Sequence, residues 1–304
     1  MKNDKQNIQI INSVSELHKL LGLPQPQHPL ITLIDHAAVQ PIDTNQNPNL
    51  VLNFYNITIK RSFKGQMKYG KSYYDFDEGT MSFMAPNQVI GIDDAANSNK
   101  EGWSLLFHPD LIRNYPLGAV IKNYGFFSYD LNEALHLSAE EEQLIEKGVQ
   151  NIKTEYESRM DQYSQDVMVS SLALLLNYCN RFYNRQFVTR KMANTDVLTQ
   201  FEKVLSKHFE DKTDQMLPTV QGLAKELSLS TSYLSDMLRT VTGQNTQQHI
   251  HNKVLENAKD LLTTTNLTVS EIAYKLGFEH PQSFSKLFKN KSGVSPLAFR
   301  QSFN

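Results

Sequence analysis

The chain has 304 residues, which is long for a single hydrophobic core and suits two domains. Hydrophobic residues make up 40% and charged residues 20% of the chain, a composition that excludes a mainly disordered protein. The formal net charge is -2, so the whole molecule has no general attraction for a polyanion, and any nucleic-acid site must be found as a local pattern.

The single cysteine, Cys179, excludes an internal disulfide and any zinc site that is built from several thiolates. No apolar run approaches the roughly 18 residues that span a bilayer, and residues 1–6 are polar with no apolar segment behind them. We therefore expect a cytoplasmic protein with no membrane partner.

Residues 29–108 contain short apolar runs that predict β-strands at 30–34, 51–59, 73–76, 81–84, 89–92 and 103–107. Turn signals such as Gly65, Gly79 and the Pro86-Asn87 pair separate these runs. Many short strands with polar turns favour a β-barrel or a β-sandwich. A pocket for an apolar or sugar-like effector could use the aromatic residues of this segment, although most of them are expected in the core: Tyr73, Tyr74, Phe76 and Trp103.

The same segment gives no sign of an enzyme. No histidine occurs between Asn53 and Phe107, so the strands lack the His cluster of a metal-dependent barrel. His36 and His108 flank this stretch, and we interpret both as surface or hydrogen-bonded core residues. Cys179 lies in the apolar run 170–183, where a low-pKa thiolate is not favoured. We expect no catalytic residue, no metal and no cofactor.

Two long helices follow the predicted strands. Ser138 and Glu141 form a capping box that opens a helix ending near residue 157. A second helix is predicted over 164–184, and residues 188–195 are interpreted as a linker. The second helix carries an apolar stripe that exceeds what a short connector needs: Val167, Leu172, Leu175, Leu176, Cys179 and Phe182.

An apolar pattern then occurs twice. The first copy is Val220, Leu223, Ala224, Leu227, Leu229, Leu234, Met237 and Leu238. The second copy is Val269, Ile272, Ala273, Leu276, Phe278, Phe284, Leu287 and Phe288, offset by 49 residues before the turn and by 50 after it. Each copy predicts two short helices joined by a turn, the unit that places its second helix in the DNA major groove.

Capping residues support this division. Thr268 and Glu271 form a capping box, and Ser230 is placed to cap the second helix of the first copy. Gly243 and Gly293 stand where a glycine ends a helix in the left-handed conformation. One amphipathic helix is predicted between the copies, from its apolar residues Ile250, Val254, Leu255, Ala258, Leu261 and Leu262.

A helical bundle that only packs is the alternative interpretation of this periodicity. Against it, residues 281–304 contain four basic residues and no acidic one: Lys286, Lys289, Lys291 and Arg300. Four segments near the C-terminus together resemble the signature of the AraC/XylS family of transcriptional regulators. They are Thr268 to Phe278, Ser283 to Lys289, Gly293 to Pro296, and Phe299-Arg300. The resemblance covers roughly residues 197–303.

The resemblance implies an α+β protein that binds double-stranded DNA as a transcription regulator. Its implied domains are a cupin-like effector barrel (1–137), a helical dimerisation segment (138–187), the linker (188–195) and a double helix-turn-helix domain (196–304). A small-molecule effector, a homodimer and RNA polymerase are the further partners that it implies. Carried over by position, base contacts are expected from Ser232, Ser235 and Asp236, and from Gln282, Ser285 and Lys286, with phosphate contacts from Arg239 and Lys289.

The chain departs from the family pattern in two places. Val254 stands where the linker helix often has arginine, and Leu238 stands where an aromatic residue is common. Asp236 repels phosphate, and residues 195–304 contain 12 Lys or Arg against 11 Asp or Glu, a net charge of +1. We therefore expect the second copy to supply more of the nonspecific affinity for DNA. Ser232, Ser235 and Lys289 could also be ordinary solvated residues.

Two other functions compete with regulation. An alkyl-transfer repair enzyme fused to such a helical domain needs a nucleophilic cysteine and a four-cysteine zinc site, which one cysteine excludes. A ligand-binding barrel whose helical part mediates only protein contacts stays open.

Overall fold

The computed structural model describes residues 8–40, 49–61, 67–69, 72–74, 79–91, 101–130, 133–189, 191–210 and 216–303. It divides into two compact units, Met1–Gln186 and Phe187–Asn304, which we describe separately. The first unit contains sheets and helices and the second only helices, so the mixed α+β class is confirmed.

The first unit is built on a five-stranded antiparallel sheet in the order β10-β7-β4-β9-β2. Its strands are β2 (Ile31–Asp35), β4 (Tyr55–Lys60), β7 (Thr80–Met84), β9 (Gly102–Phe107) and β10 (Leu135–His136). A three-stranded sheet contains β1 (Ile8–Ile11), β3 (Asn49–Leu52) and β8 (Gln88–Gly91), and a hairpin contains β5 (Met67–Tyr69) and β6 (Ser72–Tyr74). Among the described residues these sheets do not close into a barrel.

Most predicted strands are present, with one clear correction. The run 51–59 is not one strand, because β3 ends at Leu52 and β4 begins at Tyr55. The two strands belong to different sheets. Strands β1, β5 and β10 were not predicted, since they have only two to four residues each and no clear alternation of apolar and polar side chains.

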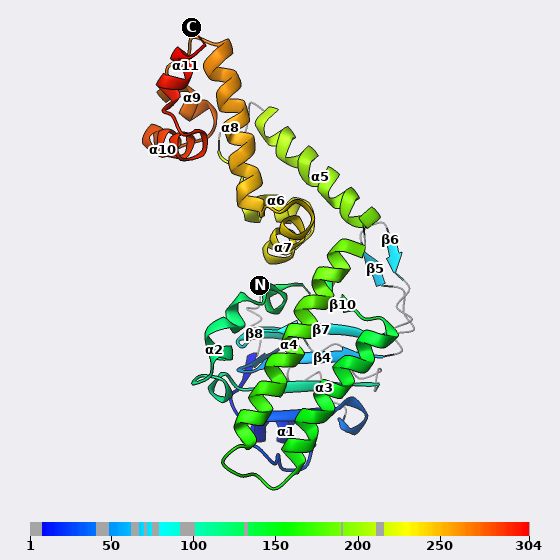
Figure 1. Cartoon of the computed structure of the whole chain (residues 1–304). Coiled ribbons are helices and arrows are strands. Elements are labelled where there is room, and N and C mark those ends of the chain that lie inside the picture. Colours follow the sequence, from blue (N-terminus) through cyan, green and yellow to red (C-terminus); the bar gives the residue numbers. More distant parts are fainter. Residues whose placement is uncertain are drawn as a thin grey trace, which may run out of the picture. The chain divides into compact units, whose positions relative to one another are not determined.

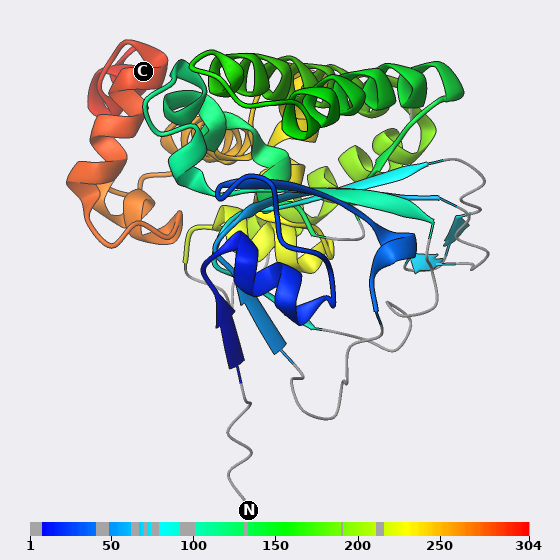
Figure 2. The same ribbon diagram turned by 90° about the horizontal axis from the view of Figure 1, so that it is seen from below.

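Two helices, α3 (Ala139–Glu157) and α4 (Ser164–Thr189), lie side by side across one face of the five-stranded sheet (Figures 1 and 2). They approach closely where α3 has Gly148, since a Cβ on this residue would lie 3.4 Å from Leu175 of α4. The predicted stripe on α4 is buried except for Val167, which is 46% exposed. Helix α4 also runs five residues beyond its predicted end at 184.

The opposite side of the first unit holds a second apolar cluster. Helix α1 (Val14–Leu20), which opens with a Ser13 and Glu16 capping box, packs there against β3, β2 and β9 through Leu52, Ile34 and Leu106. The remaining helical segments are η1 (His36–Ala38), η3 (Pro109–Leu111), α2 (Pro116–Val120), η4 (Ile121–Asn123) and η5 (Gly125–Ser128). This cluster therefore covers the part of the five-stranded sheet that carries Ile34 and Leu106, on the face opposite α3 and α4.

The second unit contains the two predicted helix pairs. Its helices are α5 (Lys191–Glu210), α6 (Val220–Glu226), α7 (Thr231–Thr242), α8 (Thr246–Thr264), α9 (Val269–Lys275), α10 (Pro281–Ser292) and α11 (Pro296–Gln301). The predicted caps are confirmed, because Ser230 accepts from the N–H of Tyr233 and Thr268 forms its capping box with Glu271. Most of the expected linker 188–195 is helical, since α4 ends at Thr189 and α5 begins at Lys191.

Gly243 and Gly293 end α7 and α10 with φ values of +77° and +82°. No atom lies within 4 Å of the position that a Cβ would take on either residue. The backbone conformation, and not a lack of space, therefore explains why glycine stands at both helix ends.

Across the described ranges, no helix is both long and apolar enough to cross a membrane. In the same ranges no three His, Cys, Asp or Glu side chains are grouped so that they could hold a metal ion. Cys179 is fully buried, and burial raises the pKa of its thiol. This environment suits packing and disfavours a reactive thiolate.

Candidate nucleic-acid interface

Helix α8 (Thr246–Thr264) is the continuous helix that connects the two helix-turn-helix motifs. The first motif (α6 and α7) lies at one end of α8 and the second motif (α9 and α10) at the other (Figure 1). The 19 residues of α8 give a length of about 28 Å at a rise of about 1.5 Å per residue. This length is comparable to the repeat of about 34 Å between successive major grooves on one side of a duplex.

The internal repeat places the predicted DNA-contacting residues at equivalent positions of α7 and α10. With an offset of 50 residues the pairs are Ser232 with Gln282, Ser235 with Ser285, Asp236 with Lys286 and Arg239 with Lys289. The buried side chains between them also stand at equivalent positions of the two helices. Leu234 corresponds to Phe284, and Leu238 corresponds to Phe288. Each set therefore lies along one helix, on the side that the core residues leave free.

The second motif presents its predicted residues to solvent. Gln282, Lys286 and Lys289 are exposed on α10, and Ser285 is half-buried. Helix α10 carries no acidic side chain. This surface combines an amide and two cations, which suit contacts with adenine, guanine and phosphate.

Arg300 has a structural position within the same stretch. Its Nε donates to the carbonyl of Leu262 at 3.0 Å and its Nη2 donates to the carbonyl of Leu267 at 2.6 Å. Leu262 lies in the last turn of α8, where helix carbonyls lack partners within the helix, and Leu267 lies in the segment between α8 and α9. The sequence count of four basic residues therefore overstates the free positive charge, because Arg300 is used to tie α11 to α8.

The first motif is chemically different. Arg239 Nη1 lies 2.8 Å from Asp236 Oδ1 within α7, with side chains 57% and 27% exposed. An exposed ion pair of this kind adds little stability. It does place a carboxylate beside the only basic residue of α7, so this helix has no net charge to offer to phosphate.

Ser235 is half-buried and its hydroxyl is 2.9 Å from the hydroxyl of Thr246, which has no exposed surface. Ser235 was predicted as a base contact, and the structure directs its hydroxyl toward the start of α8. At the equivalent position the second motif has Pro296, which has no hydroxyl group. Ser285 therefore lacks the partner that Ser235 has, a difference that the 50-residue offset could have revealed.

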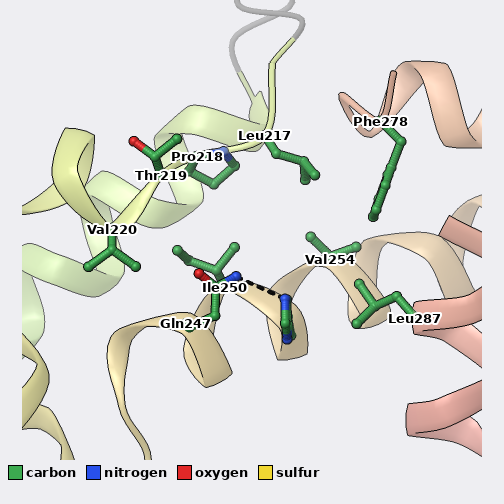
Figure 3. Close-up of a pocket in the computed structure, with 10 residues that line it drawn as sticks. Leu217, Pro218, Thr219, Val220, Gln247, Ile250, Val254, Phe278 and Leu287 are labelled. Carbon is green, nitrogen blue, oxygen red and sulfur yellow. Dashed lines mark hydrogen bonds between the residues drawn. The ribbon is translucent and has the colours of Figure 1, made fainter. Parts of the chain in front are cut away.

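An open groove lies along α8 between the two motifs, and we call it the linker groove (Figure 3). Its volume is about 390 Å³. Three segments line it, namely the entry to α6, the N-terminal half of α8, and the second motif: Leu217, Pro218, Thr219, Val220, Gln247, Ile250, His251, Val254, Phe278 and Leu287. No local sequence pattern predicts this groove, because its residues come from segments up to 70 positions apart.

The effector candidates of the first unit are only partly described. Phe76 and the side chains of Tyr73 and Tyr74 lie outside the described residues. Trp103 is 7% exposed and its indole N–H donates to Glu146 Oε1 of α3 at 2.8 Å. Glu146 also pairs with Arg61, so Trp103 belongs to the contact between α3 and the sheet.

The other face of β4 and β9 carries a connected row of polar side chains. Thr58 Oγ1 lies 3.0 Å from Asn56 Oδ1 and 2.8 Å from Ser104 Oγ, which in turn lies 2.8 Å from His36 Nε2. Burial lowers the pKa of His36, and the cation of Lys60 lowers it further, so the imidazole is held neutral. This polar row offers hydroxyl, amide and imidazole groups on one surface.

Comparison with known proteins finds similarity in the helical part of the chain. A helix-turn-helix domain model matches residues 223–302. The HTH-type transcriptional regulator YisR of Bacillus subtilis is 32% identical over 109 residues, 36% of each chain. The raffinose operon transcriptional regulatory protein RafR of Pediococcus pentosaceus is 33% identical over 138 residues, 45% of this chain and 48% of RafR.

Among solved structures, the C-terminal domain of the response regulator yesN from Fusobacterium nucleatum is 30% identical, with a TM-score of 0.32, over 34% of this chain and 98% of that one. The chain spans less than half the length of the two curated relatives. The residues that the domain model matches include the last four residues of α6 and all of α7 to α11. Residues 223–302 thus form an AraC-type helix-turn-helix domain, and in this region the chain is similar to proteins named as transcriptional regulators.

Proposed function

We propose that the chain is a sequence-specific DNA-binding transcription regulator. The observation that carries this proposal is the pair of helix-turn-helix motifs on one rigid helix, with Gln282, Lys286 and Lys289 exposed on α10. A helix of the length of α8 suits two motifs that enter successive major grooves on one side of a duplex. At promoters, such binding recruits or blocks RNA polymerase.

The two motifs have different roles in this proposal. The second motif supplies base contacts from Gln282, Ser285 and Lys286 and a phosphate contact from Lys289. The first motif reads the site through Ser232, Asp236 and Arg239, with less nonspecific affinity because the two charges of α7 are paired. Ser235 contributes less than Ser285, since Thr246 already engages its hydroxyl.

The first unit is proposed to regulate DNA binding. We assign residues 1–137 to a cupin-like effector domain, 138–187 to a helical dimerisation segment, 188–195 to the connection and 196–304 to the DNA-binding domain. The polar row from Asn56 to His36 suits a hydroxyl-rich effector, because each group can exchange hydrogen bonds with a sugar-like ligand. Leu174 and Val167 of α4 are 52% and 46% exposed, which favours a helix-mediated homodimer.

DNA binding by the full chain tests the proposal. A duplex selected from a random pool should bind at least about tenfold more tightly than a scrambled duplex, and the affinity should fall steeply with salt. If Lys286 reads a base, Lys286→Ala should weaken binding to the selected duplex and reduce the preference at one base pair by roughly 1 to 3 kcal/mol. Lys275→Ala, an exposed lysine of α9, is the matched control.

Two results would redirect the proposal. Uniform weakening of all duplexes by Lys286→Ala moves this residue to the phosphate contacts. A full chain with neither sequence preference nor salt dependence contradicts DNA reading altogether, and supports a helical domain that mediates only protein contacts.

A further inference from the structure

The linker groove is an opening that the DNA-binding surface does not use. It lies between the first motif, α8 and the second motif (Figure 3), and its lining side chains differ from the predicted DNA contacts. We propose that the linker groove binds a small amphipathic anion, with an apolar body between the two motifs and its anionic group beside His251, where the cation of Lys291 is near enough to act on it.

The walls of the groove are suited to an apolar body. Seven of its ten lining residues are apolar. Val220 of α6, Leu287 of α10 and Leu217 before α6 are only half-buried, so the chain itself does not complete their packing. An apolar ligand would remove these three surfaces from water, which is the main driving force for binding in such a cleft. The volume of about 390 Å³ lies within the range of small-molecule sites.

The rim of the groove is suited to an anion. Gln247 Nε2 lies 2.8 Å from His251 Nε2, and since an amide nitrogen donates, the imidazole nitrogen accepts. The remaining ring proton is therefore on Nδ1, which makes His251 a donor. Burial lowers the pKa of His251, and the nearby cation of Lys291 lowers it further. None of the ten lining residues is acidic.

Occupancy of the groove acts on both motifs. A ligand that packs against Val220 touches the start of the first motif, and one that packs against Leu287 touches the helix that carries Lys286. Ligand binding should therefore change the affinity for DNA, and DNA should change the affinity for the ligand by the same factor. This coupling, unlike the groove itself, rests on the proposed function.

A matched pair of fluorescent probes tests the site in the full chain. 1-Anilinonaphthalene-8-sulfonate has an apolar body and one sulfonate, and N-phenyl-1-naphthylamine has the same rings without the charge. The first probe should bind saturably and more tightly than the second. Val220→Trp, which fills the groove, should reduce its affinity at least about tenfold, and Lys291→Gln should reduce it about fivefold.

Control variants separate the groove from other apolar surfaces. Val241→Trp places the same side chain on the exposed side of α7, and Lys275→Gln removes an equal charge from α9, so both should leave the affinity within about twofold. Circular dichroism confirms that each variant is folded, because partly unfolded chains also bind this probe. Unchanged affinity in Val220→Trp or Lys291→Gln, or equal affinity for the two probes, overturns the proposal.

Separate measurements of probe binding and duplex binding distinguish the groove site from the proposed DNA-binding function. Probe binding is measured without DNA, so its failure refutes the groove site and leaves DNA binding unaffected. Duplex binding is then measured with and without saturating sulfonate probe. A shift in duplex affinity of at least about fivefold that is lost in Val220→Trp supports the coupling, and an unchanged affinity contradicts it. A chain that binds the probe but no duplex refutes the proposed function only.

Discussion

The hydroxyl of Ser235 on the first recognition helix lies 2.9 Å from the hydroxyl of Thr246, the fully buried first residue of α8. A buried hydroxyl needs a hydrogen-bond partner, and Ser235 supplies one. The position of α7 relative to α8 is therefore linked to a residue that family resemblance assigns to base reading. The second motif, with Pro296 at the position of Thr246, has no such link.

Removing one or the other partner of this hydrogen bond should have unequal effects on stability. Ser235→Ala should leave the buried hydroxyl of Thr246 without a partner and destabilise the chain by about 1 to 3 kcal/mol. Thr246→Val keeps the shape of the buried side chain and leaves the half-buried Ser235 able to bond water, so the loss should be smaller. The double variant should be more stable than Ser235→Ala. Denaturant unfolding measures all three, and a larger loss for Thr246→Val than for Ser235→Ala would contradict this interpretation.

Asp236→Asn should increase nonspecific DNA affinity. The change removes the carboxylate next to Arg239 and releases this guanidinium for phosphate. Affinity for random duplexes should rise several-fold at low salt, with about one additional unit in the salt slope. Glu226→Gln, on the exposed side of α6, changes the net charge equally and is the control. Equal increases in both variants would mean that only the total charge matters.

Arg300→Lys should destabilise the second unit without changing its charge. One ammonium group is not able to reproduce the two bonds that the planar guanidinium donates to Leu262 and Leu267. We expect a loss of about 1.5 to 3 kcal/mol, the range for hydrogen bonds that involve a charged group. Thermal unfolding measures the loss. At a temperature where both proteins are folded, the salt slope of DNA binding should be unchanged, and a lower slope would assign Arg300 to phosphate instead.

His249 should make the stability of the chain depend on pH. Its Nε2 lies 2.8 Å from Thr242 Oγ1, and burial lowers its pKa more than the nearby Glu202 raises it. Because the folded pKa is below the unfolded one, the stabilisation is fully present above pH 6.5 and is lost as the pH falls through the folded pKa. The melting temperature should therefore decrease between neutral and mildly acidic pH, and decrease less in His249→Gln. His280 is exposed, and the control variant His280→Gln should show the same decrease in melting temperature as the unaltered chain.

Local signals predicted the second unit well. The capping box at Thr268, the cap at Ser230 and the helix-ending Gly243 and Gly293 act within four residues, and all are present. Apolar spacing of 3 and 4 residues marked the buried sides of α6 to α10 because a helix repeats every 3.6 residues. The two motifs and their connecting helix could therefore be predicted from the sequence.

The first unit was predicted less completely. The run 51–59 appeared continuous because β3 and β4 are both apolar, and only pairing with different strands separates them. Trp103 was a pocket candidate because an aromatic residue in a strand suits either face of a sheet. Its bond to Glu146, 43 residues later, places it against α3.

The sequence by itself determined where the helices of the second unit begin and end, and which residues stand at equivalent positions of the two motifs, since both depend on interactions within a few residues. Only the tertiary structure decided how those equivalent residues are used. Ser235 and Ser285 are the same amino acid, but one meets Thr246 and the other Pro296, and Arg300 faces the end of α8 instead of solvent. The partners of a polar side chain are set by packing between distant segments, which no local pattern records.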